Sequence, residues 1–71
     1  MKTVREYIEE ARAKKNDVLI ETDEGTYDEM YGGGWTVAGE LGWEEEEYAF
    51  DNRTVNKVVE LEEGITIIVV E

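Results

Sequence analysis

The run "ITIIVV", residues 65–70, consists entirely of β-branched side chains, and Thr66 is its one polar residue. Branched side chains of this kind favour the pleated surface of a strand. Because apolar residues stand at consecutive positions, both faces of the strand are expected to be at least partly covered. We therefore predict a central strand here, with a helix over at least one face.

The start of the chain predicts that helix. Thr3 and Glu6 have the spacing of a capping box, in which each side chain bonds the other residue's backbone amide. Spacing of i, i+3, i+4 and i+7 gives one apolar stripe: Val4, Tyr7, Ile8 and Ala11. Glu10 and Lys14 are spaced for an ion pair, and Asn16 is a reasonable end to the helix.

Two hairpins account for most of the remaining chain. Residues 18–22 and 26–31 flank the turn Asp23-Glu24-Gly25, and residues 54–61 and 65–70 flank Glu62-Glu63-Gly64. We expect one α+β domain spanning residues 1–71. Its N-terminal helix would pack on a four-stranded, mostly antiparallel sheet made of these two hairpins.

Residues 31–50 hold five of the seven aromatic residues and five of the seven glycines. Gly32 to Gly34 predicts either a mobile loop or a close backbone approach, and Thr36 could cap a short helix over residues 36–41. A helical turn is possible over residues 43–50. At least half of the rings at Trp35, Trp43, Tyr48 and Phe50 are expected in the core, whereas Tyr31, Trp35 and Trp43 border glycines and are the better candidates for exposure.

Charge is unevenly distributed along the 71 residues. The formal net charge is −12, and the stretch from Asn16 to Asn52 contains twelve carboxylates and neither Lys nor Arg. Such a field repels nucleic acid and anionic lipid and attracts basic partners. Direct binding to nucleic acid is therefore disfavoured. The alternative explanation of the acidic composition is that net charge keeps a small protein soluble.

The sequence lacks the residues that several kinds of metal, redox and nucleotide site require. Cysteine and histidine are absent, which removes disulfides and the usual transition-metal ligands, and the spaced aspartates of an EF-hand do not occur. The triple glycine belongs to neither a Walker loop nor a dinucleotide fingerprint. Clustered glutamates on a small domain favour a solvated face over a catalytic pair. We expect a non-enzymatic protein without a metal or cofactor.

Binding to another protein fits the central stretch better. Aromatic rings provide rigid contact area, and carboxylates around them pair with Arg or Lys of a partner. The candidate partner-binding residues are Asp28, Glu29, Tyr31, Trp35, Trp43, Glu44, Glu45, Glu46, Glu47 and Asp51. Together with Glu21, Asp23, Asp28 and Glu29 of the first hairpin, the glutamates at residues 44–47 would form a sparse imitation of duplex DNA, which carries about one charge per 1.7 Å of axis. The expected partner is the basic nucleic-acid-binding site of a larger protein.

Two alternatives remain open from the sequence. The glycine loop and aromatic faces could enclose a neutral or cationic small ligand, or an unpaired strand edge such as residues 26–31 could support a homo-oligomer. Light scattering and dialysis against metabolites would separate these classes. No charged-then-apolar leader opens the sequence and no apolar run approaches about 20 residues, so we expect a cytoplasmic protein that does not enter a membrane.

In layout, the helix TVREYIEEARAKK, the acidic hairpin VLIETDEGTYDEMY and the second hairpin VVELEEGITIIVV resemble small acidic α/β proteins of phages and prophages. Some of these, among them anti-CRISPR and anti-restriction inhibitors, act as DNA mimics. The resemblance lies in size, charge and layout, and it assigns no functional residue here. The triple glycine and the uneven charge argue against an idealised designed miniprotein.

Overall fold

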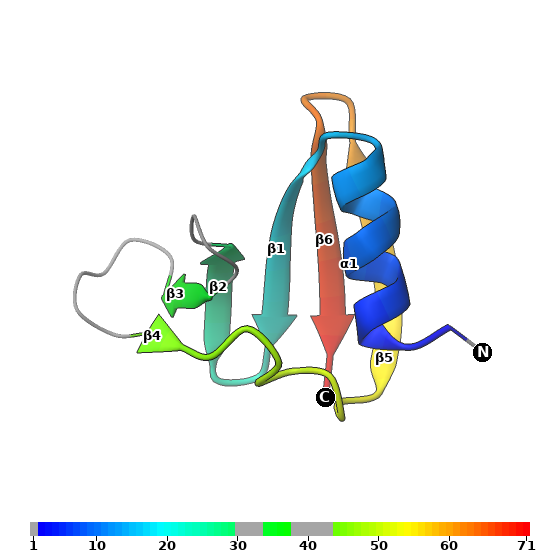
Figure 1. Cartoon of the computed structure of the whole chain (residues 1–71). Coiled ribbons are helices and arrows are strands. Elements are labelled where there is room, and N and C mark those ends of the chain that lie inside the picture. Colours follow the sequence, from blue (N-terminus) through cyan, green and yellow to red (C-terminus); the bar gives the residue numbers. More distant parts are fainter. Residues whose placement is uncertain (1, 30–33, 38–43) are drawn as a thin grey trace.

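The computed structural model describes residues 2–29, 34–37 and 44–71, with only the backbone of Glu44. The elements, in chain order, are α1 (Val4–Ala13), β1 (Asp17–Thr22), β2 (Gly25–Glu29), β3 (Trp35–Val37), β4 (Glu44–Glu45), β5 (Val55–Leu61) and β6 (Ile65–Val70). The chain is thus α+β, as the sequence predicts, with one helix followed by strands in the described residues (Figure 1).

The sheet is larger and more mixed than expected. Its order in the described residues is β4-β3-β2-β1-β6-β5, so the expected four strands are extended by β3 and the two-residue β4. The strands β1 and β6 pair in parallel, whereas the other neighbours are antiparallel. The prediction of two antiparallel hairpins missed this parallel contact because it joins the first strand to the last and leaves no local signal.

Both predicted hairpins are present. Ile20 pairs with Tyr27 in the first hairpin, and Val59 pairs with Ile67 in the second. The glycines that close the two turns have positive φ, 151° at Gly25 and 85° at Gly64. This backbone conformation strains any residue with a Cβ atom, which explains why glycine stands at both positions.

Helix α1 begins as predicted, with both halves of the Thr3–Glu6 capping box formed. Val4, Ile8 and Ala11 are buried on its apolar stripe, and Tyr7 packs against them. The expected ion pair between Glu10 and Lys14 is wrong. Glu10 instead pairs with Lys2 and Lys14 with Glu60, each at 2.7 Å, so both side chains find their partners outside the expected pair.

The end of α1 is fastened to the run at residues 65–70. The helix ends at Ala13, and Lys15 adopts a left-handed conformation with φ of 62°. This turn brings Asn16 to β6, where its Nδ2 donates to Oγ1 of Thr66 at 3.1 Å. Thr66 is 2% exposed, so the hydrogen bond satisfies the one polar side chain in the run.

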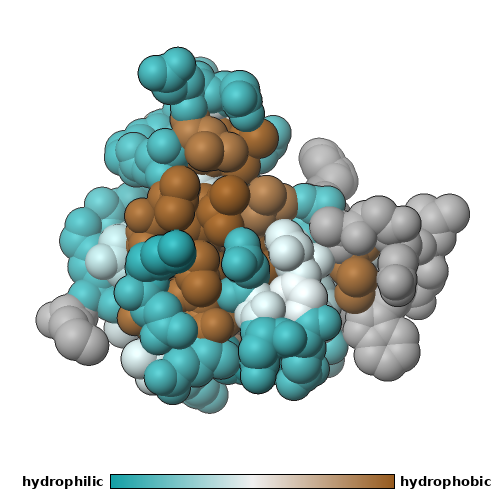
Figure 2. Space-filling view, turned by 180° about the vertical axis from the view of Figure 1, so that it is seen from behind, coloured by the Kyte–Doolittle hydropathy of each residue, from teal (hydrophilic) through white to brown (hydrophobic). Residues whose placement is uncertain are grey.

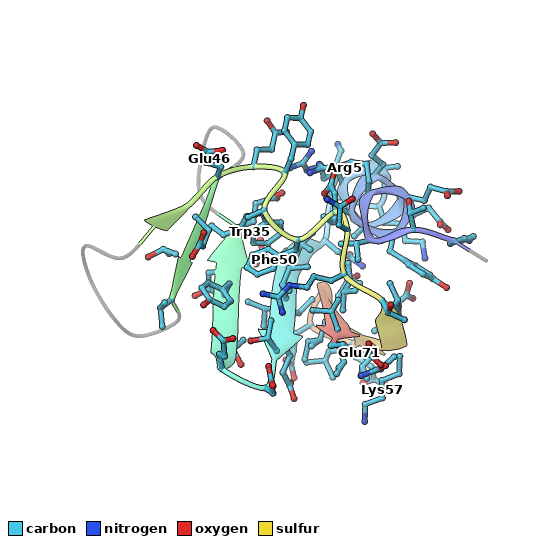
Figure 3. The ribbon with its side chains drawn as sticks, turned by 90° about the horizontal axis from the view of Figure 1, so that it is seen from below. Arg5, Trp35, Glu46, Phe50, Lys57 and Glu71 are labelled. Carbon is cyan, nitrogen blue, oxygen red and sulfur yellow. The ribbon has the colours of Figure 1, made fainter. Side chains whose placement is uncertain are left out.

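The core has two halves on one face of the sheet. Helix α1 covers β1 and β6, where Val18, Ile20 and Ile68 are buried, and β6 lies between two strands as predicted. Residues 46–54 cross the same face over β2 and β3, where Phe50 covers the other half (Figures 1 and 3). The opposite face carries neither covering element, and we call it the helix-free face.

The structure also bears on membrane insertion. Among the described residues, no helix combines the length and the apolar character needed to cross a bilayer.

Candidate functional site

The acidic residues before β5 are held by an arginine on α1. Nε of Arg5 donates to Oδ2 of Asp51 at 3.2 Å, and its Nη2 donates to Oδ1 at 3.0 Å and to the carbonyl of Glu47 at 2.9 Å. The guanidinium also lies 4.7 Å from the ring centroid of Tyr48. Burial lowers the pKa of Arg5, but the hydrogen bond and charge of Asp51, helped by Glu47, outweigh it and hold that pKa above its ordinary value.

A second arginine stands two turns further along the same side of the helix. Nε of Arg12 donates to Oε2 of Glu29 at 2.8 Å, and Oε1 of Glu47 lies 3.8 Å from guanidinium nitrogens of both Arg5 and Arg12. We call this group, Arg5, Arg12, Glu29, Glu47 and Asp51, the arginine clamp. Three predicted partner-binding carboxylates therefore have internal partners, and their charge is largely neutralised within the fold.

Trp35 is not the exposed anchor that the sequence suggested. Its side chain is 0% exposed, and its Nε1 donates to the carbonyl of Glu47 at 3.1 Å. Its ring meets Phe50 edge-on, with centroids 5.8 Å apart, and Phe50 also packs on Tyr27 (Figure 3). The burial has a simple cause: α1 covers only β1 and β6, so β2 and β3 need another apolar cover.

The same region changes the predicted local structure. Trp35 to Val37 form strand β3, so a helix beginning at Thr36 is wrong, and Glu44 pairs with Thr36 as part of β4. Residues 44 and 45 form strand β4 and residues 47–52 form turns, so the expected helical turn over residues 43–50 is not found in the described part of that range. Phe50 is in the core as predicted, whereas Tyr48 is 65% exposed.

Some of the other predicted site residues lie within the described structure, and the rest lie outside it. Glu45 is half-buried opposite Trp35, and Glu46 is exposed on the segment that follows (Figure 3). Tyr31 and Trp43, together with the loop at Gly32 and Gly33, lie outside the described residues. The same holds for the side chain of Glu44, so their predicted roles in binding keep the status of predictions.

Asp28 differs from its neighbour Glu29, because it lies on the helix-free face. It pairs across the ladder with Leu19, which alternates with the buried Val18 and Ile20 and therefore points away from the helix. The same alternation puts Asp17 and Glu21 of β1 on this face. We call Asp17, Glu21 and Asp28 the acidic triad. Among the described residues, none of the three lies within ion-pair distance of a Lys or Arg.

Asp17 was missed as a site residue, although a signal for it exists. In "DVLIET", residues 17–22, the buried residues occupy the even positions, so Asp17, Leu19 and Glu21 share the opposite face. The four consecutive glutamates at residues 44–47 are a more conspicuous acidic feature of the sequence than this alternation. A period-two reading of β1 would have grouped Asp17 and Glu21 with each other.

Beside the triad, the helix-free face is apolar. The strand registers place six half-buried or exposed side chains on it, which we call the apolar block: Leu19, Val59, Leu61, Ile65, Ile67 and Val69. Figure 2, which views the molecule from behind, shows hydrophobic residues gathered along the middle of this face with hydrophilic residues around them. No described element covers the block.

Two surface pockets lie at opposite ends of the described structure. One, of about 360 Å³, opens between the triad and the block and is lined by Asp17, Val18, Leu19, Asp28, Glu29 and Ile65. The other, of about 740 Å³, lies between the starts of α1 and β5 and includes Lys2, Tyr7, Arg53 and Lys57. The first pocket is lined by acidic residues without a Lys or Arg, whereas the second contains Asp51 beside its cations, so a cationic group suits the first pocket.

The described residues contain no group of three or more His, Cys, Asp or Glu side chains arranged to hold a metal ion. No protein-family model matches the chain, and neither a curated protein nor a solved structure matches it. Function is therefore inferred from the chain's own surface.

The strand expected to remain unpaired is also different. β2 pairs with β1 on one side and β3 on the other, so residues 26–29 are not a sheet edge. In the described sheet the edges are β4 and β5. The homo-oligomer imagined through residues 26–31 therefore loses its basis over the part of that range the structure describes.

Proposed function

We propose that this chain is a non-enzymatic binding protein or inhibitor whose acidic surface engages the basic nucleic-acid-binding site of a larger protein. Its net charge of −12 would accelerate encounter with such a site, which has evolved to attract phosphates. The proposal needs carboxylates that point to solvent and are not already neutralised.

The sorting of carboxylates between the two faces carries this proposal. On the helix side, the arginine clamp pairs Glu29, Glu47 and Asp51. On the helix-free face, the acidic triad has no such partner among the described residues. Alternate residues of a strand lie about 6.6 Å apart, so Asp17 and Glu21 are about 13 Å apart with Asp28 beside the midpoint. This spacing is sparser than a phosphate backbone but presents charge in one plane.

The proposed contact residues are accordingly revised. Asp28 stays from the sequence prediction, and Asp17 and Glu21 of the same face are added. The clamp carboxylates and Trp35 are assigned to stability, and Glu45 and Glu46, which lie on the helix side, are not part of this contact. Tyr31, Trp43 and Glu44 remain candidates for the rim of the contact. No residue is assigned a catalytic role.

The test begins with affinity capture from the host lysate and continues with the captured protein in purified form. We expect duplex or single-stranded nucleic acid to compete with this chain for that protein. The double variant Glu21→Lys with Asp28→Lys should slow association at least tenfold, since it reverses charge at the contact. Stopped-flow or surface-plasmon kinetics at several salt concentrations would measure the rates.

A matched control is available on the exposed side of α1. Glu9→Lys with Glu10→Lys makes the same change in net charge at exposed positions on the opposite side of the sheet from the triad. It should reduce the association rate much less. Equal effects of the two double variants, or a complex indifferent to nucleic acid, would contradict the proposal.

A further inference from the structure

The apolar block is the largest feature of the helix-free face that the proposed function does not use. Its six side chains are aliphatic and adjacent on β5, β6 and β1, and five of them are half-buried while Leu61 is 38% exposed (Figure 2). In protein interfaces, an apolar centre of this kind is commonly surrounded by a polar rim. Because the block lies beside the acidic triad, the two form one continuous surface with an apolar part and an acidic part.

The dimensions indicate what part of an interface the block could supply. Three strands span about 10 Å and the distance from Ile65 to Val69 is about 13 Å, which gives roughly 130 Å² in projection. A standard interface buries about 800 Å² on each partner. The block can therefore form only the dry centre of a contact, and polar residues around it must supply the rest.

Charge around the block discriminates between possible occupants. The triad borders it on β1 and β2, and Lys57, which stands opposite Val69, is the cation of this face among the described residues. A second copy of the chain would bring two triads and two net charges of −12 together, which opposes association. A partner with cations beside an apolar stripe would match both halves.

The pocket of about 360 Å³ between the two halves fits one particular side chain. Leu19 and Ile65 line it with apolar surface, while Asp17 and Asp28 add carboxylates. A lysine or arginine buries its aliphatic stem against apolar atoms while its charged end remains with polar groups. The lining therefore offers both parts of such a side chain a suitable contact.

We propose that the helix-free face is a docking surface for a basic amphipathic segment of the partner protein. Apolar side chains of that segment lie on the apolar block, and its Lys or Arg side chains meet the acidic triad, one of them entering the pocket. This inference deepens the proposed function and rests on it for the basic character of the partner. It adds that charge alone does not account for the contact.

A synthetic helical peptide with Leu on one face and Lys on the other serves as the probe. Its control has Ser in place of every Leu and the same charge. We expect the Leu peptide to bind at least tenfold more tightly by isothermal titration. In amide NMR spectra of the wild-type protein, its addition should shift resonances of β1, β5 and β6 and leave those of α1 unchanged.

Variants separate the two halves of the surface. Ile67→Thr retains a β-branched side chain. It should lower the affinity for the Leu peptide about tenfold and leave the affinity for the Ser peptide unchanged. Asp28→Asn should weaken both peptides. The matched control is Tyr48→Ser, which removes an exposed ring on the helix side and should change neither affinity. Circular dichroism would verify that each variant folds. If a variant is unstable, the NMR titration of the wild-type protein still tests which strands the peptide contacts.

The outcomes distinguish this inference from the function on which it rests. Equal affinity for the two peptides would overturn the apolar dock and leave the charge-based function in place. Resonance shifts confined to α1 would also overturn it. Absence of binding by either peptide at low salt would contradict both proposals. A stable dimer in light scattering, disrupted by Ile67→Thr, would assign the face to a second copy and overturn the inference.

Discussion

Lys15 occupies a backbone conformation that its side chain opposes. Its φ of 62° places it in the left-handed region directly after the helix cap at Lys14. This position after a helix commonly holds glycine, because a Cβ atom there costs about 1 kcal/mol or more. The turn is retained because it carries Asn16 to Thr66 and β1 into register with β6.

Replacing Lys15 with glycine should therefore stabilise the protein by about 1 kcal/mol, since the strain is removed and no contact is lost. Urea unfolding followed by circular dichroism would measure the change. The control Lys15→Ala removes the same charge but keeps Cβ, and it should give no comparable gain. Equal stabilisation by both variants would attribute the effect to charge rather than to backbone conformation.

Trp35 shows where single-residue prediction fails. Its neighbours Gly32 to Gly34 suggested exposure, because glycines usually accompany open loops. Burial was decided instead by which part of the sheet α1 leaves uncovered, and that depends on tertiary arrangement. The opposite case is Thr3, where capping needs only residues three positions apart, and the prediction from sequence is confirmed.

At the scale of elements, the arginine clamp joins α1 to residues 46–54. Arg5 provides hydrogen bonds to both the side chain of Asp51 and the backbone of Glu47, whose carbonyl also accepts from Trp35. The clamp thus fastens the segment that covers the second half of the core. Its two arginines come from one side of one helix, seven residues apart.

Arg5→Ala should lower the free energy of unfolding by about 2 kcal/mol, because charge-assisted hydrogen bonds are lost and Asp51 is left without its partner. Hydrogen exchange in residues 46–53 should accelerate more than exchange in β6. The exposed pair of Lys2 with Glu10 supplies the comparison, and Lys2→Ala should leave exchange in that segment unchanged.

A double-mutant cycle of Arg5→Ala with Asp51→Ala would isolate their coupling from other effects. Additive losses would show that the clamp does not act as described. Of the elements themselves, the helix and both hairpins were predictable, because their signals are periodicity and turn residues. Strands β3 and β4 were not, because three- and two-residue strands carry too little pattern to recognise.

At the scale of the whole molecule, the net charge of −12 works against compactness. The clamp and the surface ion pairs relieve part of this repulsion on the helix side. The carboxylates of the acidic triad and of the two hairpin turns, at residues 23–24 and 62–63, still repel one another. The number of carboxylates was therefore evident from the sequence but their useful positions were not, since pairing with Arg5 and Arg12 depends on a fold that sequence spacing does not reveal.

We expect the melting temperature to rise with NaCl concentration, because the screening length falls to about 3 Å at 1 M and repulsion among carboxylates weakens. Calorimetry over a salt series would measure it. A Glu62→Lys, Glu63→Lys variant carries less negative charge and should show a smaller rise. A melting temperature that falls with salt would indicate that attractive ion pairs dominate instead.

The parallel contact between β1 and β6 has a consequence for synthesis in the cell. The paired residues Asp17 and Ile65 lie 48 positions apart in the sequence, yet β6 supplies part of the surface on which α1 packs. A nascent chain that has just left the ribosome with α1 and the first hairpin therefore has no completed core. Until the run at residues 65–70 emerges, the growing polypeptide depends on its abundant negative charge to remain dispersed.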